Sequence, residues 1–279
     1  MTTRRVAALH PALRDDIADL VTRRPVPGPG LEQVDPFLFL NHHGPQTYRP
    51  GNNGLPFGPH PHRGFETVTF ILDGSLAHHD SGSGASVVEA GGVQWMTAGS
   101  GLVHAELSPE EFKRSGGPLE LLQLWVNLPA RLKMTEPDYI PVPAAAMAEA
   151  TLGEAVTMCA VSGTEDAPIR SLTDVMLAIV TIEAGGSATL PAPAGRSVLF
   201  YTISGSARIG GDEVPEHHLA KLGEGEDIAV ESAHGCRILY GHADPIGEPV
   251  VAHGPFVMNT QAEIAEAIRD YQAGKFGGL

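Results

Sequence analysis

The stretch Phe57-Gly-Pro-His-Pro-His-Arg-Gly-Phe-Glu66 decides how the rest of the chain is interpreted. It contains two histidines, His60 and His62, that are separated by one residue. Side chains along a β-strand alternate between its two faces, so both imidazoles point to the same side if the segment is extended. Because imidazole is the commonest metal ligand in proteins, this pair is a candidate metal-binding element.

A second segment, Gly101-Leu-Val-His-Ala-Glu106, repeats the spacing with a carboxylate in the second place. If the two segments are neighbouring strands, His104 and Glu106 converge with His60 and His62. Three imidazoles and one carboxylate suit a transition metal, whereas magnesium and calcium prefer shells made of oxygen. The spacing therefore predicts a metal site whose ligands are these four side chains.

The composition excludes several classes of function. The chain has 279 residues, 42% of them hydrophobic, which is enough for two ordinary domains with full cores. Its formal net charge is −15, and binding to nucleic acid or to an anionic membrane needs clustered Lys and Arg. We therefore expect no direct contact with nucleic acid and no membrane association, whereas a protein partner is compatible with this charge.

Cysteine content and hydropathy indicate a protein of the cytoplasm. Cys159 and Cys236 are the two cysteines and form no Cys-x-x-Cys pair, so we expect buried, reduced thiols. No uninterrupted apolar run approaches the roughly 18 residues of a membrane span. The amino-terminal residues lack the apolar core of a signal peptide.

Short β-type runs separated by Gly and Pro predict an all-β fold of sandwich or barrel type. Two turn sequences support this, Asp73-Gly74 after one run and Gly210-Gly211 within a later pair of strands. The clearest expected strands are 67–72, 121–126, 175–180, 197–203 and 237–240.

One helix is expected close to the carboxyl end. Thr260 and Glu263 match a capping box, in which both side chains satisfy backbone donors at a helix start. Ile264, Ile268 and Tyr271 then fall on one face, and Gly274 follows as a stop signal. This amphipathic face predicts that the helix packs on the surface of a barrel.

Weak similarity between two halves of the chain predicts two β domains. Leu72–Leu76 and Ile203–Ala207 both end an apolar strand on a tight turn and start another. The expected boundaries are a metal-binding domain over 1–136, a linker over 137–169 and a second domain over 170–279 that lacks metal and ends in the helix.

The remaining histidines are assigned structural roles. His78 and His79 follow a strand beside Asp80, which favours a solvated turn over a ligand role. For His42 and His43 a surface position at a strand end is favoured, with a hydrogen bond to the metal ligands as the alternative. In the second half no His-x-His pair occurs, so that half is expected to hold no metal.

The sequence resembles the cupin superfamily and, within it, the pirin family. The resemblance extends over about residues 33–278. It depends on long motifs, namely the segments 60–69, 92–106, 122–129, 253–260 and 270–277. One departure is Asn41 where we expect Asp before the Gly-Pro turn of the family, with His43 in place of an apolar residue.

The resemblance implies a bicupin, that is, two jelly-roll β-barrel domains in one chain. It also implies one mononuclear metal in the amino-terminal barrel, usually iron, with manganese, nickel, copper, zinc or cobalt as alternatives. The ligands carried over by position are His60, His62, His104 and Glu106, the same four that the spacing predicts.

Bacterial members of the family are similar to quercetin 2,3-dioxygenases, which implies a flavonol-like aromatic substrate that reacts with O2 and releases carbon monoxide. Glu106 would then be both metal ligand and general base. The alternative implied by the family is a non-enzymatic, iron-dependent redox sensor that regulates a protein partner, as a transcription cofactor does. Both functions need the same four ligands, so the sequence leaves them open.

Overall fold

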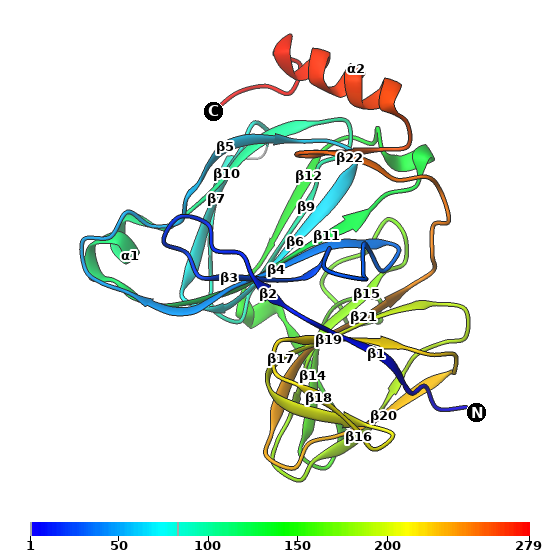
Figure 1. Ribbon diagram of the computed structural model, residues 1–279. Helices are drawn as coiled ribbons and strands as arrows, with labels where there is room; N and C mark the ends of the chain where they lie inside the picture. The colour runs from blue at the N-terminus through cyan, green and yellow to red at the C-terminus, as the bar shows by residue number, and fades with distance from the viewer. Residues whose placement is uncertain (1, 83) are drawn as a thin grey trace. The chain divides into compact units, whose positions relative to one another are not determined.

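The computed structural model describes residues 2–82 and 84–279. Most of them lie in antiparallel β-sheets, which form two compact units that we describe one at a time (Figure 1). The first unit comprises Arg14–Arg23, Phe37–Ala145 and Ile246–Leu279, and the second comprises residues 2–13, Arg24–Pro36 and Ala146–Pro245.

The first unit contains both predicted metal motifs. One of its sheets has the strand order β5-β10-β7-β8, and the other has the order β12-β9-β6-β11-β4-β3-β2. The strands of these sheets are β2 (Leu13–Arg14), β3 (Thr22–Val26), β4 (Phe37–Tyr48), β5 (Phe57–His62), β6 (Phe65–Asp73), β7 (Ser75–Asp80), β8 (Gly84–Glu89), β9 (Val93–Thr97), β10 (Leu102–Leu107), β11 (Gly117–Asn127) and β12 (Asp138–Val142).

Short elements complete the first unit. They are the helix α1 (Glu110–Ser115), the 3-10 turns η1 (Ala130–Leu132) and η2 (Ala144–Ala146, at the unit boundary), the hairpin β22 (Val251–His253) with β23 (Phe256–Met258), and the helix α2 (Gln261–Gln272).

The strands predicted at 67–72 and 121–126 are confirmed as parts of β6 and β11, which pair with each other. The predicted Asp73-Gly74 turn joins β6 to β7, and Gly74 has φ +80°. A Cβ at this glycine would lie 2.6 Å from the carbonyl oxygen of Pro118. Glycine is therefore required here both by its positive φ and by the close approach of β11.

The second unit is a sheet of order β1-β19-β17-β21-β15-β14-β13, with β16, β18 and β20 paired beside it. Its interior is filled by apolar side chains such as Phe200, Tyr240 and Ile228. The strands are β1 (Val6–Pro11), β13 (Ala148–Gly153), β14 (Val156–Ser162), β15 (Met176–Ile182), β16 (Ser187–Pro191), β17 (Ser197–Ile209), β18 (Asp212–Pro215), β19 (His218–Leu222), β20 (Asp227–Glu231) and β21 (Cys236–Ala243).

The predicted carboxyl-terminal helix is confirmed as α2. Thr260 is its N-cap and accepts a hydrogen bond from the backbone N–H of Glu263, as the capping box predicts. The helix lies against β22 and β23 (Figure 1). Ile264 is buried in the contact with Phe256 and Met258 of β23, and Gly274 follows the helix with φ +74°. In the described part of the chain, no helix has the length and apolar character needed to cross a membrane.

The two ends of the chain do not follow the sequential domain boundaries that the sequence predicts. Residues 2–13 lie in the second unit, where β1 pairs with β19, and Ile246–Leu279 lies in the first. The expected boundaries follow chain order because sequence similarity identifies strands but not the sheet that a terminal segment joins. The helix assigned to the second domain thus packs on the unit that carries the metal motifs.

Candidate metal centre

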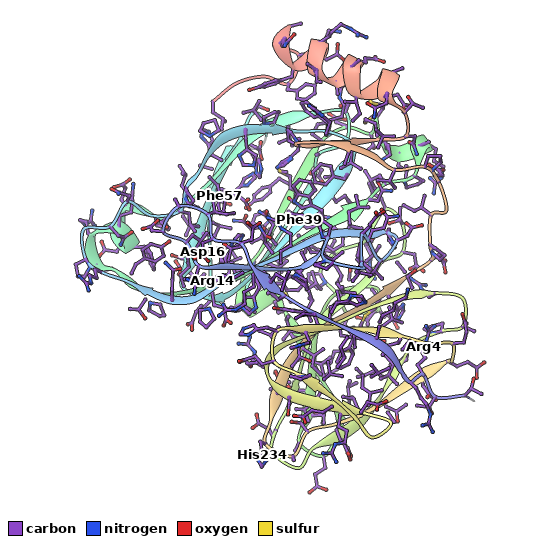
Figure 2. All side chains as sticks on the ribbon, viewed as in Figure 1. Arg4, Arg14, Asp16, Phe39, Phe57 and His234 are labelled. Carbon is purple, nitrogen blue, oxygen red and sulfur yellow. The ribbon has the colours of Figure 1, made fainter. Side chains whose placement is uncertain are left out.

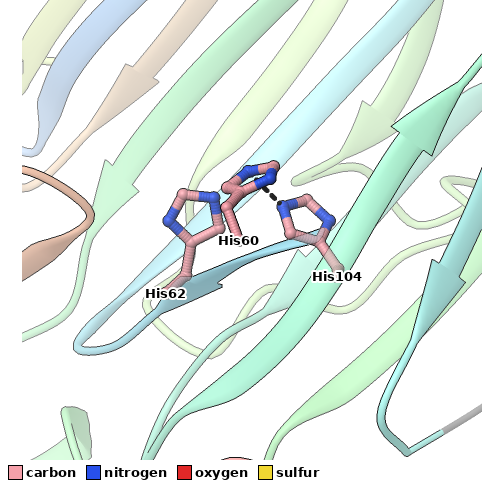
Figure 3. Close-up of side chains that lie close together, drawn as sticks. All are labelled: His60, His62 and His104. Carbon is pink, nitrogen blue, oxygen red and sulfur yellow. Dashed lines mark hydrogen bonds between the residues drawn. The ribbon is translucent and has the colours of Figure 1, made fainter. Parts of the chain in front are cut away.

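The two motif strands are neighbours, as the sequence predicts. β5 and β10 pair antiparallel, with Leu102 opposite His62 and His104 opposite His60. One nitrogen from each of the three imidazoles can be chosen so that all lie within 4.8 Å of one another. Figure 3 shows the three rings gathered together. The Nε2 atoms of His60 and His104 are 3.0 Å apart. Period-two alternation on paired strands therefore brings the three nitrogen donors together.

Hydrogen bonds at the far side of two rings fix which nitrogen faces the centre. Nδ1 of His60 lies 2.8 Å from the carbonyl oxygen of Gly58, and Nδ1 of His62 lies 3.4 Å from that of Pro255. A carbonyl oxygen can only accept, so each Nδ1 carries the hydrogen and each Nε2 keeps a lone pair. Two lone pairs therefore point to the cluster, which is the tautomer that metal ligation requires.

Burial keeps these rings neutral. The pKa of His62 is lowered to about 3, mainly by burial and to a smaller extent by the neighbouring His60. Burial also lowers the pKa of His60, and it brings the pKa of His104 well below its usual value. Nδ1 of His104 is buried and has no hydrogen-bond partner among the described residues. At neutral pH the cluster is thus a set of uncharged nitrogen donors.

Glu106 lies two residues beyond His104 on β10 and therefore on the same face of the strand. Its carboxylate accepts hydrogen bonds from Thr69 Oγ1, at 3.1 Å, and from the amide nitrogen of Gln123. Burial raises the pKa of Glu106 to about 7, although these two hydrogen bonds oppose the shift. The close group of potential metal-binding atoms consists of the three histidines and does not include the Glu106 carboxylate. Thr69 and Gln123 fix the position of this carboxylate on the neighbouring part of β10.

The assignment of His78 to a solvated turn is wrong. His78 lies in β7, is 2% exposed, and stands opposite Glu106 on the neighbouring strand. Its ring centroid lies 5.3 Å from that of His104, and its Nε2 lies 2.7 Å from Oδ2 of the buried Asp80. The sequence does contain a pattern that indicates this position, because His78 and Asp80 form a His-x-Asp pair with the same spacing as His104 and Glu106. Only His79, between them, is exposed.

His42 and His43 are not surface residues, which corrects the position favoured from the sequence. Both lie in β4 and are essentially inaccessible to solvent. His42 Nε2 lies 2.9 Å from a carboxylate oxygen of Glu120, and His43 Nδ1 lies 2.9 Å from Thr22 Oγ1. These hydrogen bonds explain how two adjacent imidazoles on opposite faces of one strand can both be buried.

Two aromatic side chains lie beside the cluster, namely Phe65, whose ring centroid is 5.1 Å from that of His62, and Trp125, which no sequence motif singles out. The ring centroid of Trp125 lies 5.5 Å from that of His62, and it packs against Phe65 at 4.4 Å and Phe39 at 4.7 Å. Phe39 and Trp125 remain half-buried, and Figure 2 labels Phe39. Trp95, on β9, donates a hydrogen bond to the buried Glu66.

Fold and donor set together define the class of this protein. Two β-barrel domains of jelly-roll type, one of which carries a His-x-His pair opposite a His-x-Glu pair, define a bicupin, as expected from the sequence. Comparison with known proteins gives the same result. The Pirin family model matches residues 19–126, and that of the Pirin C-terminal cupin domain matches residues 177–277.

The chain belongs to the pirin family. Human pirin is 37% identical over 265 residues, which cover 91% of this chain and 87% of the human protein. A pirin-like protein of Caulobacter vibrioides is 36% identical over 89% of this chain and 90% of its own length. The crystal structure of a quercetin 2,3-dioxygenase from Acinetobacter baumannii superposes with a TM-score of 0.92 at 31% identity, covering 99% of both chains.

Proposed function

We propose that this protein is a metal-dependent dioxygenase that cleaves a flavonol such as quercetin with O2 and releases carbon monoxide. One observation carries the proposal: three neutral imidazoles converge beside a buried carboxylate in a pirin-family barrel. The similarity to the Acinetobacter baumannii quercetin 2,3-dioxygenase supports the choice of reaction.

The side chains present fit a transition metal. The Nε2 lone pairs of His60 and His62 and a nitrogen of His104 lie close enough together for a cation to bind them, and a buried carboxylate nearby on the strand of His104 supplies negative charge. We propose that His60, His62, His104 and Glu106 hold one mononuclear ion, with iron as the first choice. When bound, the ion would supply Lewis-acid and redox chemistry towards the substrate hydroxyl and O2.

Glu106 is the proposed general base. A flavonol must lose its 3-hydroxyl proton to become electron-rich enough to react with O2, and the carboxylate of Glu106, buried on the same strand as His104, is placed to accept it. Gln123 and Thr69 orient the carboxylate, because each donates a hydrogen bond to a different oxygen. The proton would be held at an oxygen of Glu106 inside the barrel.

Trp125 and Phe39 are the proposed contact surface for the aromatic substrate. The two rings are stacked and half-buried, and Trp125 lies beside His62, so together they offer an apolar surface next to the proposed ligands. The indole N–H of Trp125 is buried and has no hydrogen-bond partner among the described residues, which makes it a donor for a substrate oxygen.

The test is quercetin consumption coupled to carbon monoxide release, measured in air with iron-loaded protein. We expect turnover by the wild type and its loss in His62→Ala, which removes one nitrogen donor. His79→Ala is the matched control, because it removes an exposed imidazole from a strand of the same sheet. Absence of turnover by protein shown to contain stoichiometric iron would overturn the proposal and favour the regulatory alternative.

A further inference from the structure

The carboxyl-terminal segment Ile246–Leu279 pairs with the backbone that immediately follows the His-x-His strand. The N–H of Arg63 donates to the carbonyl of Pro255 at 3.3 Å, and the N–H of Val257 donates to the carbonyl of Arg63 at 3.1 Å. The contact is close, since a Cβ on Gly64 would lie 2.0 Å from the carbonyl oxygen of Val257. An isolated parallel bridge between Arg63 and Phe256 therefore joins the segment to the turn that follows the His-x-His strand.

This segment also supplies the acceptor that orients His62. His60 finds its acceptor locally, at the carbonyl of Gly58 two residues earlier. His62 has its acceptor at Pro255, which is 193 positions away in the sequence. The tautomer of His62 therefore depends on where the carboxyl-terminal segment lies.

A buried ion pair anchors this segment to the motif turn. Both terminal nitrogens of Arg63 donate to Oδ2 of Asp270 at 3.0 Å, and its Nε donates to the carbonyl of Ser100 at 2.7 Å. The guanidinium also lies 4.6 Å from the ring centroid of Phe276. Arg63 is 4% exposed, so its charge depends on Asp270 for compensation.

A second cation fixes the same junction. The ammonium of Lys133 donates to the carbonyls of Gly64, at 2.8 Å, and Val257, at 3.0 Å, and to Oδ1 of Asn127, at 2.7 Å. Lys133 thus holds the motif turn and the carboxyl-terminal strand to each other. These bonds use all three N–H donors of the ammonium. Lys133 therefore holds the two backbones together but has no donor left that could replace the Arg63–Asp270 contact.

We propose that Arg63 and Asp270 are positioning residues for the metal centre: through them the carboxyl-terminal segment holds Pro255 against His62 and selects its Nδ1–H tautomer. This inference rests on the proposed function for the identity of the site. It makes metal affinity dependent on a residue of α2 that lies in neither ligand motif and does not touch a proposed ligand.

The first experiment reads the tautomer in the metal-free protein. Long-range 1H–15N correlation spectra, with His62 assigned by comparison with His62→Gln, are recorded for the wild type, Asp270→Asn and Glu266→Gln. Glu266 is the matched control because it is an exposed carboxylate in the same helix. We expect the Nδ1–H form of His62 in the wild type and the control, and a tautomer mixture in Asp270→Asn.

The second experiment measures Co2+ affinity by competition with a chelator, together with the visible absorption of the Co2+ protein. We expect Asp270→Asn to bind Co2+ on the order of 10-fold more weakly than Glu266→Gln, with a changed spectrum. Arg63→Lys keeps the charge but loses the two-nitrogen contact, so it should weaken binding in the same direction and provides a second variant if Asp270→Asn does not fold.

The outcomes separate the two proposals. Unchanged tautomer, affinity and spectrum in both variants would overturn the positioning role, even if their unfolding free energies fall. A wild type that binds no Co2+ would instead overturn the proposed function, whereas the tautomer spectra would still decide whether the carboxyl-terminal segment orients His62.

Discussion

The imidazole of His78 lies flat against the phenol ring of Tyr139, with centroids 3.7 Å apart and 4° between the ring planes. Tyr139 is fixed in turn by a 2.6 Å hydrogen bond between its hydroxyl and Ser86 Oγ. At the edge of the imidazole ring, Nε2 of His78 is hydrogen-bonded to Oδ2 of Asp80. Burial lowers the pKa of His78, so the ring is neutral and donates its Nε2 hydrogen to the carboxylate. Tyr139 and Asp80 thus hold His78 in place next to His104.

Asp80→Ala tests whether this contact stabilises the fold. The substitution leaves the buried Nε2–H of His78 without an acceptor and removes the acceptor of the Gly82 N–H. We expect the free energy of unfolding to fall by about 2 kcal/mol, measured by urea denaturation. The control is His79→Ala, whose side chain is exposed and which should change stability by no more than about 0.5 kcal/mol. Equal effects of both substitutions would contradict this role of Asp80.

Much of the candidate site follows from period-two alternation alone. His60, His62 and His104 converge because they occupy same-face positions on paired strands, and the sequence shows both spacing and strand character. The same rule applies to His78 and Asp80, but the sequence was interpreted as placing His78 just past the end of a strand. β7 in fact continues to Asp80 because it is paired to β10 on one side and β8 on the other.

Long-range contacts set what the sequence could not predict. The helix α2 was predicted from its own capping box, yet its docking partner depends on a pair, Arg63 and Asp270, separated by 207 positions. Nothing local to either residue specifies the other. Similarly, Trp125 resembles an ordinary strand residue in the sequence, and only the tertiary structure places its ring beside His62.

Gly64→Ala should disrupt the junction between the motif turn and the carboxyl-terminal strand. Gly64 has φ +91°, and its added Cβ would overlap the carbonyl oxygen of Val257, which the sheet pairing prevents from moving freely. We expect a loss of about 3 kcal/mol in the free energy of unfolding. Gly278→Ala is the control, because a Cβ there would meet no atom within 4 Å. A Gly64→Ala protein as stable as this control would show that the junction yields to the added methyl group.

Glu106 should make the stability of the metal-free protein fall as the pH rises. Its pKa is raised to about 7 in the folded state, whereas the pKa of an unfolded Glu is 4.5. Between these values the folded state binds the extra proton, so stability is highest below pH 4.5, declines as the pH approaches 7 and is level above it. The decline due to this group should be about 3 kcal/mol.

Urea denaturation of chelator-treated wild type and Glu106→Gln at pH 5 and pH 8 measures this contribution. The difference between the two proteins isolates Glu106, because Glu66, whose pKa burial also raises, is present in both. We expect the wild type to lose more stability than Glu106→Gln on going to pH 8. Parallel losses in the two proteins would mean that Glu106 is not held in a proton-binding environment.

Metal addition should stabilise the protein through the histidine cluster. A ligand that binds only the folded state at 100 times its dissociation constant adds about 2.7 kcal/mol to the free energy of unfolding. We expect this gain with Ni2+ or Co2+ and not with Mg2+, since nitrogen donors disfavour magnesium. His104→Ala should abolish the gain, whereas His79→Ala should retain it, as thermal and urea unfolding with and without metal would measure. An equal gain in His104→Ala would place the bound metal elsewhere and would contradict the assignment of this ligand.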